Sequence, residues 1–180
     1  MTTSSSIHAL LHLISASGET VDSRIRLQKE VFLLRWLGHR SFVDFHFSYY
    51  HYGPYSRGLS DVLHSAVLAG FLHEERQDFE NDHTRYTYSL TEKGRHSVPN
   101  EVGASSSRSI AQRLGSEHWQ TLELAATALF LEEDRDFDLD AALKRALELK
   151  PKCREYKDKA VEVIDYLFSM RRGIRSSARS

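Results

Sequence analysis

The chain has 180 residues, of which 41% are hydrophobic and 27% charged, and its formal net charge is −1. This balance is typical of a folded globular protein, and the small net charge excludes a strongly basic nucleic-acid binder. No apolar run approaches the roughly 18 residues of a membrane-spanning helix, and the first residues lack the order of a secretory signal. We therefore expect a cytoplasmic protein with no membrane partner. The single cysteine, Cys153, excludes an internal disulfide and a multi-cysteine zinc site.

Residues 1–98 begin with two predicted helices. The first is marked by apolar residues at helical spacing, Ile7, Leu10, Leu11 and Ile14. The second follows Asp22 as its N-cap and ends at Gly38. Its second half is apolar almost all round, which predicts that this end is buried.

The middle of the chain predicts strands around a third helix. Residues 42–52 alternate aromatic and polar side chains, which indicates a short strand or extended segment before the turn at Gly53-Pro54. Ser56 is the expected N-cap of the next helix, and residues 71–77 and 84–90 read as a hairpin. This order of elements predicts a mainly α (α+β) fold, with a winged helix-turn-helix core and a small β-wing in residues 1–98.

The second half predicts a C-terminal helical segment. Residues 99–109 lose the periodicity and read as a linker or loop. Three helices are predicted within residues 110–170, packed on the winged body, and their surplus apolar surface would serve a partner helix or a homodimer. Residues 171–180 hold arginines and no acid, and are expected to fray as a basic tail.

Three stretches of the chain together resemble a known family. They are Arg26-Leu-Gln-Lys-Glu-Val-Phe-Leu-Leu34, Tyr50-His-Tyr-Gly-Pro-Tyr-Ser56 and Tyr88-Ser-Leu-Thr-Glu-Lys-Gly94. The set resembles the YwgA-like proteins and, more distantly, the SocA-like antitoxin (Panacea) domain, over roughly residues 20–168. The resemblance implies a winged-helix-like body, no catalytic residues, and a regulatory protein that acts by binding a partner, such as a toxin or an anti-phage defence effector.

The turn at residues 50–57 is the candidate contact surface. It gathers aromatic rings beside the start of a helix, and aromatic side chains are frequent anchors at protein interfaces. Together with the neighbouring helix it predicts a set of partner-binding residues: Tyr50, Tyr52, Tyr55, Arg26 and Lys29. A structural interpretation stays open, in which Gly53 and Pro54 fix the turn and the tyrosines cover the core.

The alternative function is a DNA-binding transcriptional regulator, in which the helix after the turn enters the major groove. The residues that would contact DNA are Arg57, His64, Arg85, Arg171, Arg172 and Arg175. Acidic residues surround the predicted wing, and because DNA affinity comes largely from neutralised phosphates, that wing disfavours binding.

No catalytic or metal-binding motif is recognisable. His46 and His51 lie five apart in a predicted extended segment and would point to opposite faces. Cys153 stands among basic residues, with no histidine near it in sequence. We therefore expect a non-catalytic protein with no cofactor and no metal, and favour partner binding over DNA binding.

Overall fold

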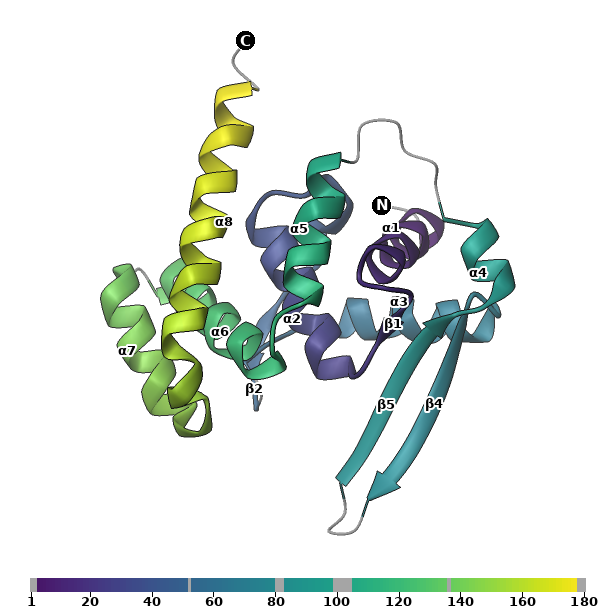
Figure 1. Ribbon diagram of the computed structural model, residues 1–180, viewed down its shortest axis with the longest axis horizontal. Helices are drawn as coiled ribbons and strands as arrows, with labels where there is room; N and C mark the ends of the chain where they lie inside the picture. The colour runs from purple at the N-terminus through teal and green to yellow at the C-terminus, as the bar shows by residue number, and fades with distance from the viewer. Residues whose placement is uncertain (1–2, 52, 80–82, 99–104, 136, 178–180) are drawn as a thin grey trace.

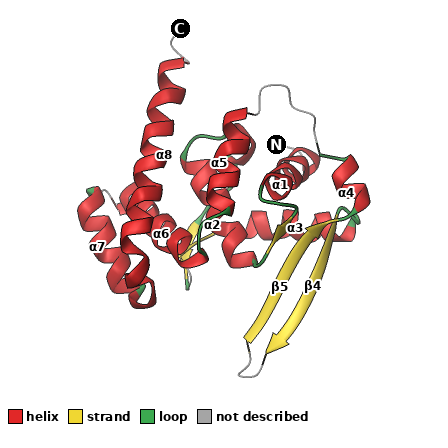
Figure 2. Ribbon diagram, viewed as in Figure 1, coloured by secondary structure: helices red, strands yellow, loops and turns green. Residues whose placement is uncertain are grey.

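The computed structural model describes residues 3–51, 53–79, 83–98, 105–135 and 137–177 (Figure 1). These residues form a mainly helical α+β fold, as predicted, with two small antiparallel sheets (Figure 2). The α-helices are α1 (Thr3–Ala16), α2 (Arg24–Trp36), α3 (Arg57–Leu68), α4 (Glu92–His96), α5 (Ser105–Gly115), α6 (Trp119–Arg135), α7 (Leu139–Leu149) and α8 (Lys157–Ser177). The 3-10 helices are η1 (Arg40–Phe42) and η2 (Pro151–Tyr156). The strands are β1 (Thr20–Val21), β2 (Ser48–Tyr50), β3 (Gly53–Tyr55), β4 (Leu72–Phe79) and β5 (His83–Leu90).

The first three helices and one sheet form the N-terminal body. Its three strands lie in the order β1-β5-β4, and all neighbouring strands are antiparallel. The predicted hairpin is confirmed: Leu72 pairs with Leu90 at its base and Phe79 with His83 at its far end. The hairpin projects away from the helices (Figure 1), while Tyr88 at its base is fully buried.

Helix α3 forms as its sequence predicts. The Ser56 hydroxyl accepts a hydrogen bond from the Leu59 backbone N–H at 3.3 Å, which satisfies a free N–H group of the first turn. The predicted apolar face is buried at Leu59, Val62, Leu63 and Ala66. Helix α2 differs in one detail, because its N-cap is Ser23 and not the predicted Asp22.

The short strand or extended segment predicted over residues 42–52 is a strand only in its last part. Residues 40–42 form η1, and only Ser48–Tyr50 is a strand. The aromatic residues of the first part, Phe42 and Phe45, are buried in the hydrophobic core with their ring centroids 6.2 Å apart. The alternation that suggested a strand therefore reflects core packing of an irregular segment.

The C-terminal helices pack directly on this body. Helix α5 begins at Ser105, inside the predicted linker of residues 99–109, and buries Ile110, Ala111 and Leu114 against α1 and α2. Residues 99–104 lie outside the described part of the chain. Helix α6 contacts α2, α7 and α8 and is buried throughout residues 121–131. No helix in the described ranges combines the length and apolar character of a membrane span.

Residues 171–177 of the predicted basic tail continue helix α8 to Ser177, and residues 178–180 lie outside the described residues. The fraying of this segment stays a prediction. Two contacts fasten the helix to α2: the Phe168 ring meets Trp36 edge-on at 4.9 Å, and the Arg171 guanidinium lies 4.2 Å from the centre of the Trp36 ring. An arginine on an aromatic face is held by both packing and charge.

Candidate binding surface

Strands β2 (Ser48–Tyr50) and β3 (Gly53–Tyr55) pair as a short hairpin that lies between α2 and α3 in the sequence. We call it the aromatic hairpin. Tyr50 pairs with Gly53 across it, and the Tyr49 and Tyr50 side chains are 39% and 57% exposed. The Tyr50 ring lies 5.6 Å from the Tyr55 ring and 4.5 Å from the His51 ring. Two predicted contact residues, Tyr50 and Tyr55, are thus brought together, whereas the third, Tyr52, lies outside the described residues.

Two buried lysines hold the hairpin from its inner side. The Lys29 ammonium donates to the Pro54 carbonyl oxygen at 2.8 Å, and the Lys150 ammonium donates to the His51 carbonyl oxygen at 2.6 Å. The lysines are only 2% and 7% exposed. A buried ammonium group is costly without hydrogen-bond partners, so both lysines favour the conformation that keeps these bonds. The bonds thereby hold the backbone on both sides of the turn.

One buried carboxylate balances this pair of lysines. The Glu123 carboxylate, from α6, lies 2.9 Å from the Lys150 ammonium. Burial lowers the pKa of Lys29 to about 7, an effect that Glu123 opposes and Lys150 reinforces. At pH 7 and above, the Lys29 side chain therefore carries less positive charge in the folded protein than it does in water.

Gly53 allows the hairpin to approach α6. Its φ of +89° is the left-handed conformation that glycine adopts without strain. A Cβ at this position would lie 2.6 Å from the Thr127 hydroxyl oxygen, which is closer than packed atoms approach. The glycine is required here by both the turn and the space beneath it.

Helix α2 also fixes the start of α3. The side-chain nitrogen of Gln28 donates to the Ser56 carbonyl oxygen at 2.9 Å, and its oxygen accepts from the Ser56 N–H at 2.8 Å. All of these groups are buried. The end of the aromatic hairpin is consequently tied to the same helix that supplies Lys29.

Arg26 and Lys29 do not form the exposed contacts predicted for them. Arg26 donates to the Glu30 carboxylate at 2.8 Å and to the carbonyl oxygens of Leu114 and Gly115 at the end of α5. Burial raises the pKa of Glu30 to about 7, although Arg26 opposes this shift. One face of α2 packs on α5 and another on the hairpin. Both basic side chains therefore bind backbone carbonyl oxygens inside the protein.

Cys153 is buried at 2% exposure, with its sulfur 3.9 Å from a Glu123 carboxylate oxygen. Burial, assisted by the negative charge of Glu123, raises the pKa of the thiol to about 11. The thiolate that nucleophilic chemistry requires is therefore disfavoured. The basic neighbours in sequence, Lys152 and Arg154, are exposed and do not change this outcome.

The residues predicted to contact DNA are dispersed. Arg57, His64 and Arg85 are exposed on α3 and β5, whereas Arg171 lies on Trp36 and Arg172 is exposed on α8. The side chain of Arg175 lies outside the described part of the structure. Figure 1 shows the end of α8 and the β4–β5 hairpin on opposite sides of the molecule. On the wing, Glu74 pairs with Arg24, and Asp78 pairs with Arg76.

Sequence reasoning missed Lys150 and Glu123, the buried residues that support the aromatic hairpin from below. Lys150 lies 99 positions from His51, and no local pattern signals a bond over that separation. No group of three or more potential metal-ligating side chains converges among the residues that the structure describes.

Comparison with known proteins adds one relative. The chain is 26% identical over 161 residues to the uncharacterized protein YwgA of Bacillus subtilis (strain 168), an alignment that spans 88% of this chain and 92% of that protein. This similarity supports a YwgA-like family. No family model matches the chain.

Proposed function

We propose that the protein is a non-catalytic regulatory or accessory protein that binds a partner protein through the aromatic hairpin. The observation that carries this proposal is the pair of buried lysines beneath exposed tyrosines. Lys29 and Lys150 immobilise the backbone at Pro54 and His51 while Tyr50 remains 57% exposed. A surface ordered before association loses less entropy on binding, and tyrosines are frequent anchors of interfaces.

The partner that we propose is a toxin or an anti-phage defence effector. This part of the proposal rests on the resemblance to SocA-like antitoxins, which act by binding. The chemistry of the surface agrees with a protein partner, because Tyr49, Tyr50 and Tyr55 offer apolar rings with polar hydroxyl tips.

We further propose that α1, α2, α3 and the sheet β1-β5-β4 form a winged helix in the cytoplasm of a prokaryote. The element order and the strand order support this assignment. DNA binding is the weaker function for it, since the wing carries the acidic side chains of Glu74 and Asp78, which pair with Arg24 of α2 and Arg76 of β4. Acidic side chains on the wing oppose the approach of DNA phosphates.

The test begins with affinity purification of the tagged full chain from its native host, with nuclease treatment, followed by reconstitution with the purified partner. Titration calorimetry should show that Tyr50→Ala weakens the complex by about tenfold or more, as expected of an interface anchor. Leu68→Ala is the matched control, because Leu68 is exposed and apolar but lies on α3. It should leave the affinity unchanged.

Two results would overturn the proposal. In the first, Tyr50→Ala and Leu68→Ala bind the reconstituted partner equally well, which would place the contact elsewhere. In the second, only nucleic acid is recovered and it dissociates at roughly 0.5 M salt, where phosphate contacts weaken. That outcome would favour the DNA-binding regulator, and loss of binding on Arg57→Ala would then identify α3 as its contact helix.

A further inference from the structure

Strand β5 has an edge that is only partly covered. Strand β1 pairs with it at Tyr88 and Ser89, and the Leu90 N–H donates to the Glu19 carbonyl oxygen. Beyond Val21 the chain turns away into α2. Among the described residues, no strand continues alongside Thr84–Thr87 on this side of the sheet.

The ladder hydrogen bonds determine which backbone groups face this edge. The Thr91 N–H donates to the Phe71 carbonyl oxygen on the β4 side, whereas Leu90 bonds on the β1 side. In an antiparallel sheet these directions alternate residue by residue. Arg85 and Thr87 therefore direct their backbone groups toward β4, and Thr84 and Tyr86 direct theirs toward the open edge.

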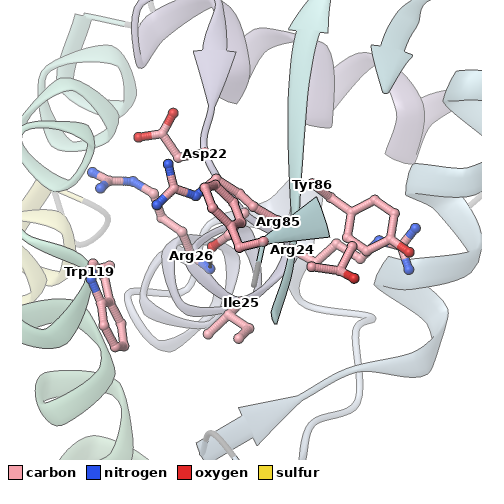
Figure 3. Close-up of a pocket in the computed structure, with 10 residues that line it drawn as sticks. Asp22, Arg24, Ile25, Arg26, Arg85, Tyr86 and Trp119 are labelled. Carbon is pink, nitrogen blue, oxygen red and sulfur yellow. Dashed lines mark hydrogen bonds between the residues drawn. The ribbon is translucent and has the colours of Figure 1, made fainter. Parts of the chain in front are cut away.

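A pocket of about 690 Å³ lies along this open edge (Figure 3). Arg85 and Tyr86, which point to opposite faces of β5, both border it, so the pocket follows the strand edge itself. The opposite wall comes from Ile25 of α2 and Trp119 of α6. Its volume is within the range of specific ligand sites.

The pocket is lined by two exposed aromatic side chains, Phe79 and Trp119, and by the guanidinium group of Arg85. Trp119 and Phe79 are 43% and 42% exposed, and such large apolar side chains often mark interaction sites. Arg24 is engaged by Glu74, and Arg26 by Glu30. In contrast, no ion pair joins Arg85 to another described residue; its guanidinium lies 5.3 Å from the centre of the Phe79 ring.

We propose that this pocket and edge bind an extended peptide segment of a partner protein, which adds a strand antiparallel to β5. Main-chain hydrogen bonds to Thr84 and Tyr86 hold the segment, an apolar side chain packs on Trp119, and an acidic side chain pairs with Arg85. This is the β-augmentation mode, in which backbone pairing supplies affinity and adjoining pockets supply specificity. The site is separate from the aromatic hairpin and goes beyond the proposed function.

The test uses a phage-displayed library of random peptides selected on the immobilised full chain. A selected peptide is then titrated into isotopically labelled protein, and amide hydrogen exchange is followed by nuclear magnetic resonance. Binding should slow exchange of the Thr84 and Tyr86 amides by about tenfold or more, because strand pairing protects them. The Arg85 and Thr87 amides, already paired with β4, should change little.

Backbone pairing is tested directly with two variants at one position. Thr84→Pro removes an N–H that faces the open edge and spares the ladder to β4, a position where a sheet tolerates proline. Thr84→Val keeps that N–H, and both variants lose the Thr84 hydroxyl, which donates to Asp78. The peptide should lose about tenfold or more in affinity for the Pro variant only.

Three outcomes would overturn the inference. They are failure of the library to yield a binder, equal affinity of the peptide for the Pro and Val variants, and protection of the edge amides by self-association without peptide. Tyr50→Ala should leave peptide affinity unchanged. If Tyr50→Ala abolishes peptide binding while Thr84→Pro does not, the peptide occupies the aromatic hairpin, so this inference fails while the proposed function stands.

Discussion

The side chain of Gln28 makes with Ser56 the two hydrogen bonds that a neighbouring strand would make. Its nitrogen lies 2.9 Å from the Ser56 carbonyl oxygen, and its oxygen lies 2.8 Å from the Ser56 nitrogen. Ser56 is also the N-cap of α3 and directly follows β3. One carboxamide therefore joins a helix start, a strand end and the middle of α2.

Gln28→Ala should destabilise the fold. The change leaves the buried Ser56 N–H without its partner, at about 1–3 kcal/mol, whereas the Ser56 carbonyl oxygen still accepts from the Ser60 N–H. We expect the free energy of unfolding, measured by urea denaturation, to fall by roughly 1–3 kcal/mol. Gln112→Ala, an exposed position on α5, is the control and should change little. Equal losses for the two variants would contradict the importance of this pairing.

Gly53→Ala should destabilise more than Gly38→Ala. Both glycines have a positive φ, +89° and +85°, so both variants carry the backbone strain of a left-handed alanine. Only the Gly53 Cβ meets Thr127, whereas nothing lies within 4 Å at Gly38. The difference in unfolding free energy should be about 1–3 kcal/mol, the usual cost of overpacking.

A double-mutant cycle isolates that clash. Thr127→Ala removes the hydroxyl oxygen that the new Cβ would approach. In the Thr127→Ala background, Gly53→Ala should cost about as much as Gly38→Ala. If the excess cost of Gly53→Ala persists there, the strain lies in the backbone alone.

Lys29 should make stability rise with alkaline pH. Its pKa is lowered to about 7 in the folded protein from an ordinary 10.5. Below pH 7 the amine is charged in both states, and its burial penalty is fully present. Between pH 7 and 10.5 the unfolded chain binds more protons than the folded chain, so this residue raises the free energy of unfolding as pH increases.

The comparison of Lys29→Met with the parent chain measures this contribution. Urea denaturation at several pH values should show that the stability difference between parent and variant shifts in favour of the parent as pH rises from 7 to 10.5. Lys144→Met, at an exposed position of α7, is the control and should follow the parent curve. A pH-independent difference for Lys29→Met would show that the amine does not titrate in this range.

Cys153 should react slowly with thiol reagents. The side chain is 2% exposed, and its pKa is raised to about 11, so little thiolate is present and little of it is accessible at pH 8. Labelling by a disulfide reagent should be at least about tenfold slower in the folded protein than in urea. Because this is the sole cysteine in the sequence, fast labelling of the folded chain would show directly that the site around Glu123 opens.

Local signals in the sequence predicted the elements that depend on local chemistry. Ser56 caps α3 as predicted, with its hydroxyl accepting from the Leu59 N–H at 3.3 Å. The alternation of β5 places Tyr88 and Leu90 in the core. Each of these features depends on residues that are close together in the sequence. The spacing of apolar and polar residues was therefore sufficient to predict them.

The roles of the α2 polar residues could not be predicted in the same way. Arg26 and Lys29 look like surface cations because charged side chains are seldom buried. Their partners, the end of α5 and Pro54, come from parts of the chain that only the folded structure brings close. Tyr50, by contrast, has the exposure expected of a contact residue, while its binding role remains a prediction.

The bond between Lys150 and the His51 carbonyl oxygen spans 99 positions, which has a consequence for synthesis on the ribosome. A nascent chain that has released the first hundred residues already contains every tyrosine of the aromatic hairpin, but not the lysine that fastens one side of its turn. The Glu123 carboxylate that balances this lysine also emerges late. The hairpin therefore reaches its final form only after residue 150 has left the ribosome, and a growing polypeptide presents an unfinished surface to its surroundings.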